Sequence, residues 1–560
     1  MGISRFLAAV TVVLVAAGCA PAAAGPELPR PVSPPPSVTT TTVVVTTTTI
    51  DPAELMATEC PTAFCLVYQL REGARWSNGT PLTPDDFART ADLFADPLVT
   101  PASPGYDLIE SIDIVDEDRF RVVFSEPFGP WQQLFSRVLP AGHDPSDITG
   151  LPTTGAFRFV EWVPGDRIVL RRDPEWWSPV DLVTGAPPGT VEEITFVFYP
   201  DREEMLAALE DGVVDVITVR PDLETVEALA GMEEITTVVA PGPLWEHIDF
   251  HHQDERLVED WVRRAIALGI DREKILDRTI RLYDPTASGL DNTIWMANTA
   301  NYEDHYDREF DPARAEELLV ANGCERGDDG VHACSGRRLS FTWATTSDDP
   351  ARVETFESVR EDLAQIGIEI VADYRDPSDF VTRGFLFGGP ETWQLINFAW
   401  RLGSDPGRQS ESYYCGEFDL NVNRFCSAEV EELVRSAGSI TDPVERVEAL
   451  NEADRQYLDS DALIPLYQLS TLMAWGPSVG GLAPNWSSST DMWNAGSWSG
   501  EASIVVALPA EPETLDPLLA SDESANMVLS MLFHGALAMT PAHEHVPALV
   551  SSVTVVEGSG

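Results

Sequence analysis

The sequence predicts an α/β protein with more than one lobe, and three observations support this fold class. The chain of 560 residues is long enough for three or four packing units of roughly 150 residues each. Hydrophobic residues make up 44% of the chain, a content typical of a folded globular body. Segments with strand periodicity alternate with segments of helical periodicity over most of its length, which is the pattern of an α/β sheet.

The first predicted elements of the body are strands joined by tight turns and one capped helix. Residues 66–73 alternate as a strand does and end at a turn. Thr83 and Pro84 suit the N-cap and the first position of a helix. Two hairpins are expected next, at 109–115 with 119–124 and at 157–162 with 167–171.

A strand, helix and strand order then leads into a mostly helical region. Residues 194–199, 201–210 and 213–219 have this order, the signature of an α/β sheet. Apolar residues at three- and four-residue spacing predict helices over 254–269, 271–276, 310–322, 352–366, 428–437 and 443–459. Two further strands are expected at 368–373 and 463–467.

Residues 1–19 have the features of an export signal, with a positive Arg5, an apolar run over 6–17 and small residues before Cys19. The run is too short to span a bilayer. Small residues before a cysteine resemble the bacterial lipoprotein cleavage box, after which Cys19 would carry a lipid anchor. Cleavage after residues 22–24 is the alternative, because Ala16 stands where that box usually has Leu. Both alternatives place the protein outside the cytoplasm, either lipid-anchored to the plasma membrane or periplasmic.

Residues 20–52 are rich in Pro and then in Thr and Val, which predicts an extended linker between the signal and the folded body.

The other six cysteines form three close pairs along the chain, namely Cys60 with Cys65, Cys324 with Cys334, and Cys415 with Cys426. Six cysteines allow fifteen connectivities. In an exported chain, short spacing favours three local disulfides. A metal site is the alternative, and it is disfavoured because only His332, beside Cys334, accompanies any pair.

The charge of the chain excludes two classes of function. It has 36 basic and 91 acidic residues, a formal net charge of -55, so it would repel nucleic acid. Lys274 is the only lysine, and no glycine run precedes it. A phosphate-binding loop of the G-x-x-x-x-G-K-[ST] type is therefore absent, and any ATP hydrolysis belongs to another chain.

No catalytic motif identifies an enzyme. H-E-x-x-H does not occur, and the one G-x-S-x-G match, at 476–480, is followed by no predicted helix, unlike the strand-to-helix turn of a nucleophile elbow. The histidines gather as His247, His251 and His252, and as His543 with His545. Metal binding there is possible, but polar histidines around a loop are more often solvated. We therefore expect no catalytic residue, no metal and no cofactor.

One segment carries a family resemblance. Residues 70–87, Leu-Arg-Glu-Gly-Ala-Arg-Trp-Ser-Asn-Gly-Thr-Pro-Leu-Thr-Pro-Asp-Asp-Phe, resemble the L-R-x-G-x-x-W-x-[DN]-G-x-P-L-T-A-x-D-V segment of family 5 extracellular solute-binding proteins. These are the dipeptide, oligopeptide and nickel receptors of ABC importers. Further matches occur at 154–157 with Trp176 and Trp177, at 262–267 with 270–273, and at 464–467. The resemblance implies the two-lobed periplasmic-binding-protein fold, type II, of the large peptide-receptor class, with an extra subdomain on lobe I.

The order of the family's segments is unusual in this chain. The strand and "LDP" block that normally begins the mature protein lies here at 504–517, and the residues that normally precede the first strand end the chain. We infer a circular permutation in which residues 504–507 and 553–556 complete the sheets of lobe I; a truncated tandem is the alternative. The domains expected are 53–152 for the extra subdomain, 153–240 for lobe I, 241–468 for lobe II, and 469–560 for the completion of lobe I.

The resemblance also implies a ligand site between the lobes, whose tryptophan region matches 397–400 and makes Trp400 a candidate contact. Peptide-binding members place an Asp three residues later to hold a peptide's amino terminus. Here that position is Gly403, and Asp405 follows two residues on. Either Asp405 substitutes through a loop shift, or this receptor captures no free amine.

Six more side chains are candidate ligand contacts: Trp245, His247, Tyr413, Tyr414, Ser521 and Asp522. For the aromatic ones, core packing is the alternative. Ser521 and Asp522 align with a stretch that runs past the ligand in the family, where the contact is largely through the backbone.

The function expected is that of the solute-binding component of an ABC importer. It would bind a peptide between two closing lobes and deliver it to permease and ATPase subunits on separate chains, touching the membrane through its lipid anchor only. One alternative is a receptor of the same fold for a nickel chelate, an oligosaccharide or another small solute. The others are a surface sensor without transport and an exported hydrolase.

Overall fold

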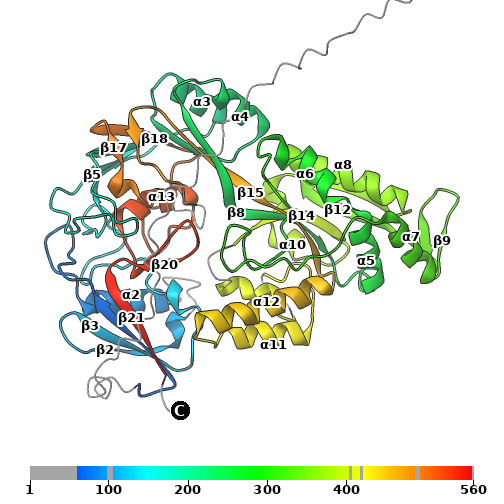
Figure 1. Cartoon of the computed structure of the whole chain (residues 1–560), viewed down its shortest axis with the longest axis horizontal. Coiled ribbons are helices and arrows are strands. Elements are labelled where there is room, and N and C mark those ends of the chain that lie inside the picture. The colour runs from blue at the N-terminus through cyan, green and yellow to red at the C-terminus, as the bar shows by residue number, and fades with distance from the viewer. Residues whose placement is uncertain (1–59, 97–104, 403–406, 417–419, 486–491, 558–560) are drawn as a thin grey trace, which may run out of the picture.

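A computed structural model describes residues 60–96, 105–402, 407–416, 420–485 and 492–557. The signal, Cys19, the linker and Asp405 lie outside these residues. Figure 1 shows two bodies that flank a pair of long strands, β8 (Thr236–Phe250) and β15 (Leu463–Trp475). We call the body built on β4 to β7 and β18 lobe I, and the body built on β12 to β14 lobe II.

One ten-stranded sheet runs through both lobes in the order β13-β12-β14-β8-β15-β7-β18-β6-β5-β4. Strands β8 and β15 pair antiparallel along their length, with two register shifts that interrupt the ladder. The remaining strands of this sheet are β4 (Phe157–Val163), β5 (Arg167–Arg172), β6 (Glu193–Phe198), β7 (Val216–Val219), β12 (Ser340–Thr346), β13 (Glu369–Arg375), β14 (Leu395–Arg401) and β18 (Ser503–Leu508). The two lobes are thus joined by continuous backbone ladders.

Strand β18, which is far along the chain from β6 and β7, forms part of the same sheet. It lies between β6 and β7 and pairs parallel with both. Helix α13 (Glu523–Leu532) follows it, and the Gly155 motif packs closely against the end of this helix. A Cβ at Gly155 would stand 2.1 Å from the carbonyl oxygen of Met531, so only glycine allows this approach.

A second sheet forms the extra subdomain in the order β2-β3-β1-β21. Its strands are β1 (Phe64–Leu70), β2 (Ile109–Ile114), β3 (Arg119–Phe124) and β21 (Val550–Glu557). Strand β21 pairs antiparallel with β1, with Cys65 opposite Val556 and Tyr68 opposite Val553. The two expected arms of one hairpin therefore lie side by side, although they come from opposite regions of the chain. Helix α2 (Pro84–Ala95) covers this subdomain with the expected Thr83 cap, here part of a capping box.

Most helices of the two lobes agree with the sequence pattern to within a few residues, but no helix was predicted over 223–230, 377–380, 383–386 or 523–532. Lobe I has α3 (Arg202–Glu210) and α4 (Leu223–Ala230). Lobe II has α5 (Asp260–Gly269), α6 (Arg272–Arg278), α7 (Pro312–Ala321), α8 (Pro350–Gln365), α11 (Ala428–Ala437) and α12 (Pro443–Asp459), together with the short α9 (Pro377–Phe380) and α10 (Arg383–Leu386). In the described residues, no helix is long and apolar enough to cross a membrane.

The expectation for the histidines was wrong. His247 is part of β8 and is completely buried, and His251 directly after the strand is buried as well. His543 is also buried, in the turn between β19 (Leu537–Met539) and β20 (His545–Pro547). The Pro241-Gly242-Pro243 stretch imitates a loop in the sequence, yet it lies within β8. The register shift between Gln468 and Ser470 of β15 lets the ladder pass these two prolines, which have no N–H to donate.

All three expected disulfides are present: Cys60–Cys65, Cys324–Cys334 and Cys415–Cys426. The second joins β9 (Cys324–Arg326) to β10 (His332–Cys334), at positions directly opposite each other. The extra subdomain shares one hydrophobic core with a face of the lobe I sheet, and lobe II has a core of its own around β8, β15 and their helices. The lobes are therefore separately packed bodies.

Candidate functional site

The site region is the boundary of the lobes, where β14 pairs with β8. Trp400 stands opposite Trp245, and Arg401 stands opposite Leu244. Because successive side chains of a strand point to opposite faces, the tryptophan pair and the Arg401 pair face different sides of the sheet. A cavity lies on each side.

The larger cavity, which we call the interlobe cavity, has a volume of about 420 Å³. It is lined by both lobes and by the connecting strands, through Tyr199, Pro200, Arg202, Met205, Thr218, Val219, Arg220, Gly242, Pro243, Leu244, Arg401, Leu469, Ser470, Thr471, Pro509 and Glu523. Tyr199, Arg220 and Pro509 directly follow the parallel strands β6, β7 and β18. The carboxyl ends of parallel strands are where open α/β sheets bind ligands.

An ion pair joins the lobes beside this cavity. Arg220 of lobe I lies 2.7 Å from the carboxylate of Asp349 in lobe II and 3.9 Å from the buried carboxylate of Glu246. Burial opposes the charge of Arg220, but the two carboxylates outweigh it and raise its pKa above the usual value. Arg352 donates to Glu246 at 2.8 Å. We call the contact of Arg220 with Asp349 the interlobe bridge.

The smaller cavity, which we call the aromatic pocket, has a volume of about 40 Å³ within lobe II. Its walls are Trp245, Asp249, Thr293, Ile294, Trp400, Leu402, Ser412, Tyr413, Leu420, Val422, Asn423, Tyr457 and Leu463. The rings of Trp245 and His247 lie 4.6 Å apart, and His247 is stacked 6.4 Å from Trp400. The pocket is thus an aromatic enclosure between the sheet and α12.

Asp249 gives this pocket a carboxylate. Its Oδ1 accepts a hydrogen bond from Asn423 at 2.9 Å, and its Oδ2 lies 3.2 Å from His247 Nε2. Asn423 also donates to the hydroxyl of Tyr457 at 2.9 Å. Burial, and then the charge of Asp249, raise the pKa of Tyr457 well above its usual value. Tyr457 therefore remains a neutral phenol, with a proton to donate.

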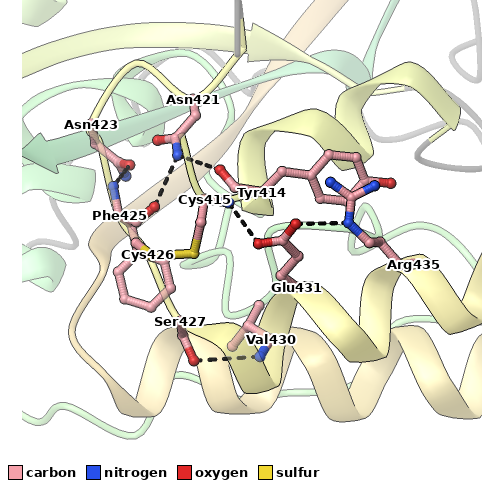
Figure 2. The surroundings of a disulfide bond; sticks show 10 residues. All are labelled: Tyr414, Cys415, Asn421, Asn423, Phe425, Cys426, Ser427, Val430, Glu431 and Arg435. Atoms are coloured by element: carbon pink, nitrogen blue, oxygen red, sulfur yellow. Dashed lines mark hydrogen bonds and ion pairs between the residues drawn. A yellow bond between two sulfur atoms is a disulfide. The ribbon is translucent and has the colours of Figure 1, made fainter. Parts of the chain in front are cut away.

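The loop closed by Cys415–Cys426 forms one wall of the aromatic pocket, and Figure 2 shows how this loop is held. The amide of Asn421 donates to the carbonyls of Tyr414 and Phe425, at 2.7 and 2.9 Å. Glu431 on α11 accepts from the Cys415 backbone N–H at 3.0 Å. The described part of the loop is thus fixed by a covalent bond and by hydrogen bonds at both of its ends.

The structure brings together four of the candidate side chains expected from the sequence. Trp245, Trp400 and Tyr413 line the aromatic pocket, and His247 packs against both tryptophans. Tyr414 instead packs on Arg435, whose guanidinium lies 3.8 Å from the ring centre. Tyr414 is not among the pocket walls.

Ser521 and Asp522 lie in lobe I, apart from these four. Asp522 is the N-cap of α13 and accepts from the Ala525 N–H at 2.8 Å, a structural role. The next residue, Glu523, lines the interlobe cavity. The Ser521–Asp522 segment therefore borders this cavity through its neighbour.

Sequence reasoning missed Asp249, Asn423 and Tyr457. Asp249 stands two residues after His247, on the same face of β8, so its position was open to inference once this segment was known to be a strand. Nothing in the sequence marked Asn423, which lies in the disulfide loop. Among the described residues, no group of three or more His, Cys, Asp or Glu side chains is arranged to hold a metal ion.

Two lobes joined by paired strands, with a cavity lined from both sides, define the class of two-lobed solute-binding proteins. The model of the bacterial extracellular solute-binding proteins, family 5 (middle region), matches residues 62–407. The chain belongs to this family.

The relatives of the chain agree with this membership. It is similar to the oligopeptide-binding protein OppA of Mycobacterium tuberculosis, with 26% identity over 424 residues that cover 72% of this chain and 69% of OppA. Its fold is similar to that of the periplasmic EDTA-binding protein EppA, with a TM-score of 0.66, 21% identity, and coverage of 80% of this chain and 91% of EppA. It is also similar to AppA of Bacillus subtilis in complex with a nonapeptide, with a TM-score of 0.57, 19% identity, and coverage of 79% of this chain and 88% of AppA.

Proposed function

We propose that this protein is the peptide-binding receptor of an ABC importer. It holds a peptide at the boundary of its lobes and delivers it to a permease and an ATPase on separate chains. The observation that carries the proposal is the interlobe cavity, because it is lined by both lobes and its shape therefore changes when they move. The oligopeptide-binding relatives support peptides as the solute class.

The mechanism of such a receptor is binding and closure, without chemistry. The interlobe bridge joins the lobes beside the cavity, and β8 and β15 supply the connection about which the lobes would move. We further propose that Cys19 carries a lipid anchor and that residues 20–52 hold the body away from the membrane.

A second candidate ligand is an anionic chelate. Three arginines, Arg202, Arg220 and Arg401, line the interlobe cavity, and guanidinium groups suit carboxylate ligands. The similar fold of an EDTA-binding protein favours this alternative. The same cavity would then serve a different solute.

Thermal unfolding of the purified protein against separate pools of di- to pentapeptides, oligosaccharides and metal chelates tests the proposal. A ligand at a hundred times its dissociation constant adds about 2.7 kcal/mol to the folded state. Stabilisation by the peptide pools supports the peptide receptor. If chelates alone raise the unfolding temperature, the second candidate ligand is supported in place of peptides. If no pool raises it, both proposals are refuted.

We also propose that the chain is a circular permutation of the family order. Support comes from β18, which fills a place between β6 and β7, and from β21, which pairs with β1. Arg71, close after β1, donates to the carbonyls of Ala548 and Pro547 at 2.8 and 2.7 Å. A truncated tandem is the alternative that the deletion described in the Discussion tests.

A further inference from the structure

The extra subdomain contacts lobe II directly, through residues outside the ten-stranded sheet. The backbone N–H of Gly129 donates to the carbonyl of Gly438 at 2.7 Å, and the indole N–H of Trp131 donates to the carbonyl of Thr441 at 3.3 Å. The two donors follow β3 in the chain, and the two acceptors lie between α11 and α12. Figure 1 shows the extra subdomain beside these two helices. We call this pair of hydrogen bonds the second interlobe contact.

This contact is so close that its lobe I side requires a glycine. A Cβ at Gly129 would stand 2.6 Å from the carbonyl oxygen of Ile440 and 2.8 Å from that of Ala437. The guanidinium of Arg446 would lie at 2.7 Å. All three of these nearest atoms belong to lobe II. Gly129 is not among the residues of positive φ, so its own backbone would accept a side chain. The glycine is therefore needed for the approach of the other lobe.

Each side of the contact is held by its own lobe. Phe128 and Trp131 are buried in the core that the extra subdomain shares with lobe I. In lobe II, Ala437 ends α11 and is completely buried, and Arg446 of α12 donates to its carbonyl. Because neither side can shift without disturbing a packed core, a Cβ at position 129 is accommodated most easily by separation of the lobes.

The place of the contact links it to the opening of the lobes. The lobes are connected through β8 and β15, and a rotation about these strands moves the outlying parts of the lobes most. The extra subdomain is such an outlying part, because its sheet is separate from the one that contains β8 and β15. The second interlobe contact therefore has to break when the lobes open.

We propose that breaking the second interlobe contact is the step that admits and releases the ligand, so that Gly129 and Trp131 set the rate of ligand exchange. They are positioning residues, since neither lines the interlobe cavity. The inference rests on the proposed function for the ligand, but the opening itself is measurable without one. The hydrogen-bonding groups are uncharged, so the contact should respond little to salt, unlike the interlobe bridge.

The first experiment needs no ligand. Hydrogen exchange of the Trp131 indole N–H is followed by NMR in the purified protein, with Trp131→Phe to assign the resonance. In Gly129→Ala we expect this exchange to become about tenfold faster, the combined effect of two weakened hydrogen bonds, because the added methyl group separates the lobes. The backbone amides of β1 should exchange as in the wild type, because the extra subdomain stays folded.

Gly384→Ala is the matched control. Gly384 lies in α10, where an added Cβ would meet no other part of the chain within 4 Å, and its φ is not positive. This variant should leave the exchange of the Trp131 indole unchanged. If Gly129→Ala also leaves it unchanged, the inference is overturned. Equal acceleration in β1 would overturn it as well, since the substitution would then loosen the subdomain itself.

Trp131→Phe is a second test variant, which adds no atoms. It keeps an aromatic ring in the core and removes the hydrogen bond to Thr441. The amide N–H of Gly129 replaces the indole as the readout, and it should exchange about two- to tenfold faster, the range for one neutral hydrogen bond. Without any acceleration, the contact would not limit opening and the inference would fall.

The last experiment connects opening with ligand exchange and separates this inference from the proposed function. The dissociation rates of trialanine and of an Fe(III)–EDTA chelate are measured for the wild type, Gly129→Ala and Gly384→Ala. A bound probe should leave Gly129→Ala about tenfold faster, the factor expected for the indole, and should associate no more slowly. An unchanged dissociation rate would overturn the inference. If neither probe binds while Gly129→Ala still speeds the exchange, the proposed function falls and the second interlobe contact stands as the one that limits opening.

Discussion

Removing the interlobe bridge is expected to loosen the contact between the lobes. In Arg220→Gln, the side chain stays polar but becomes shorter and loses the charge that lies 2.7 Å from Asp349. Asp349→Asn removes the partner's charge while leaving a good N-cap for α8, where Asp349 accepts from the Ala351 N–H. The two substitutions therefore isolate the charge pair from the helix that carries it.

The geometry sets the expected size of the effect. At 2.7 Å, the gross attraction at an effective dielectric of 20 is about 6 kcal/mol. The side chain of Arg220 is 47% exposed, so solvent reduces the net value to the range of exposed pairs, about 0.2–1 kcal/mol. Asp349 and Glu246 are far less exposed, at 13% and 1%, which favours the upper end. About 1 kcal/mol corresponds to a roughly fivefold change in the ratio of closed to open molecules.

A double-mutant cycle measured by ligand affinity, with small-angle scattering of the ligand-free protein, tests this prediction. The coupling between positions 220 and 349 should be about 0.5–1 kcal/mol, should fall at high salt, and should accompany a larger radius of gyration in the single variants. Arg202→Gln is the matched control, because Arg202 also lines the cavity but pairs with Asp222 of its own lobe. A coupling near zero, or an equal loss in the control, would refute the reasoning.

Three further predictions concern stability. Burial lowers the pKa of His543 to about 4, below its unfolded value near 6.5; acidification from pH 6.5 to 4 should therefore cost up to about 1.4 kcal/mol per pH unit. His543→Asn, which tolerates the positive φ of 61°, should reduce that slope in urea unfolding, and an unchanged slope would contradict it. Cys415→Ser with Cys426→Ser opens a loop of sequence separation 11 and should lower the unfolding free energy by about 2–3 kcal/mol, whereas unchanged stability would show that hydrogen bonds alone hold the loop. Deleting residues 503–557 should unfold lobe I and the extra subdomain, as followed by proteolysis, because β18 and β21 are strands of their sheets; an intact fold would favour the truncated tandem.

The sequence predicted the elements whose signals are local. The Thr83 cap, the helices α11 and α12 and the three disulfides depend on neighbouring residues, and all of them are present. Strand β8 was not predicted, because the two prolines near its middle imitate a turn and only the bulged pairing with β15 reveals a strand. Family resemblance located β18 and β21, whose partners are far away in the chain.

The candidate site was only partly predictable, because some of its residues come from segments that are far apart in the chain. Aromatic residues near the matched tryptophan were identifiable, and Trp245, Trp400 and Tyr413 do share a pocket. The polar residues of that pocket come from β8, from the disulfide loop and from α12, and they are joined by hydrogen bonds only because the fold brings these three segments together. No pattern in the sequence indicates that the side chains of Asp249, Asn423 and Tyr457 lie next to one another in the fold.

The pairing of β1 with β21 has a consequence for the order in which the protein can fold. Arg71 and its acceptor Ala548 are 477 residues apart in the chain, and a ribosome working at about 5–20 residues per second needs roughly half a minute or more to make that span. Throughout that time β1 lacks a neighbour on one edge, so the extra subdomain cannot be completed during early synthesis. The sheet of the extra subdomain is therefore completed only after β21 has been synthesised, long after its other three strands.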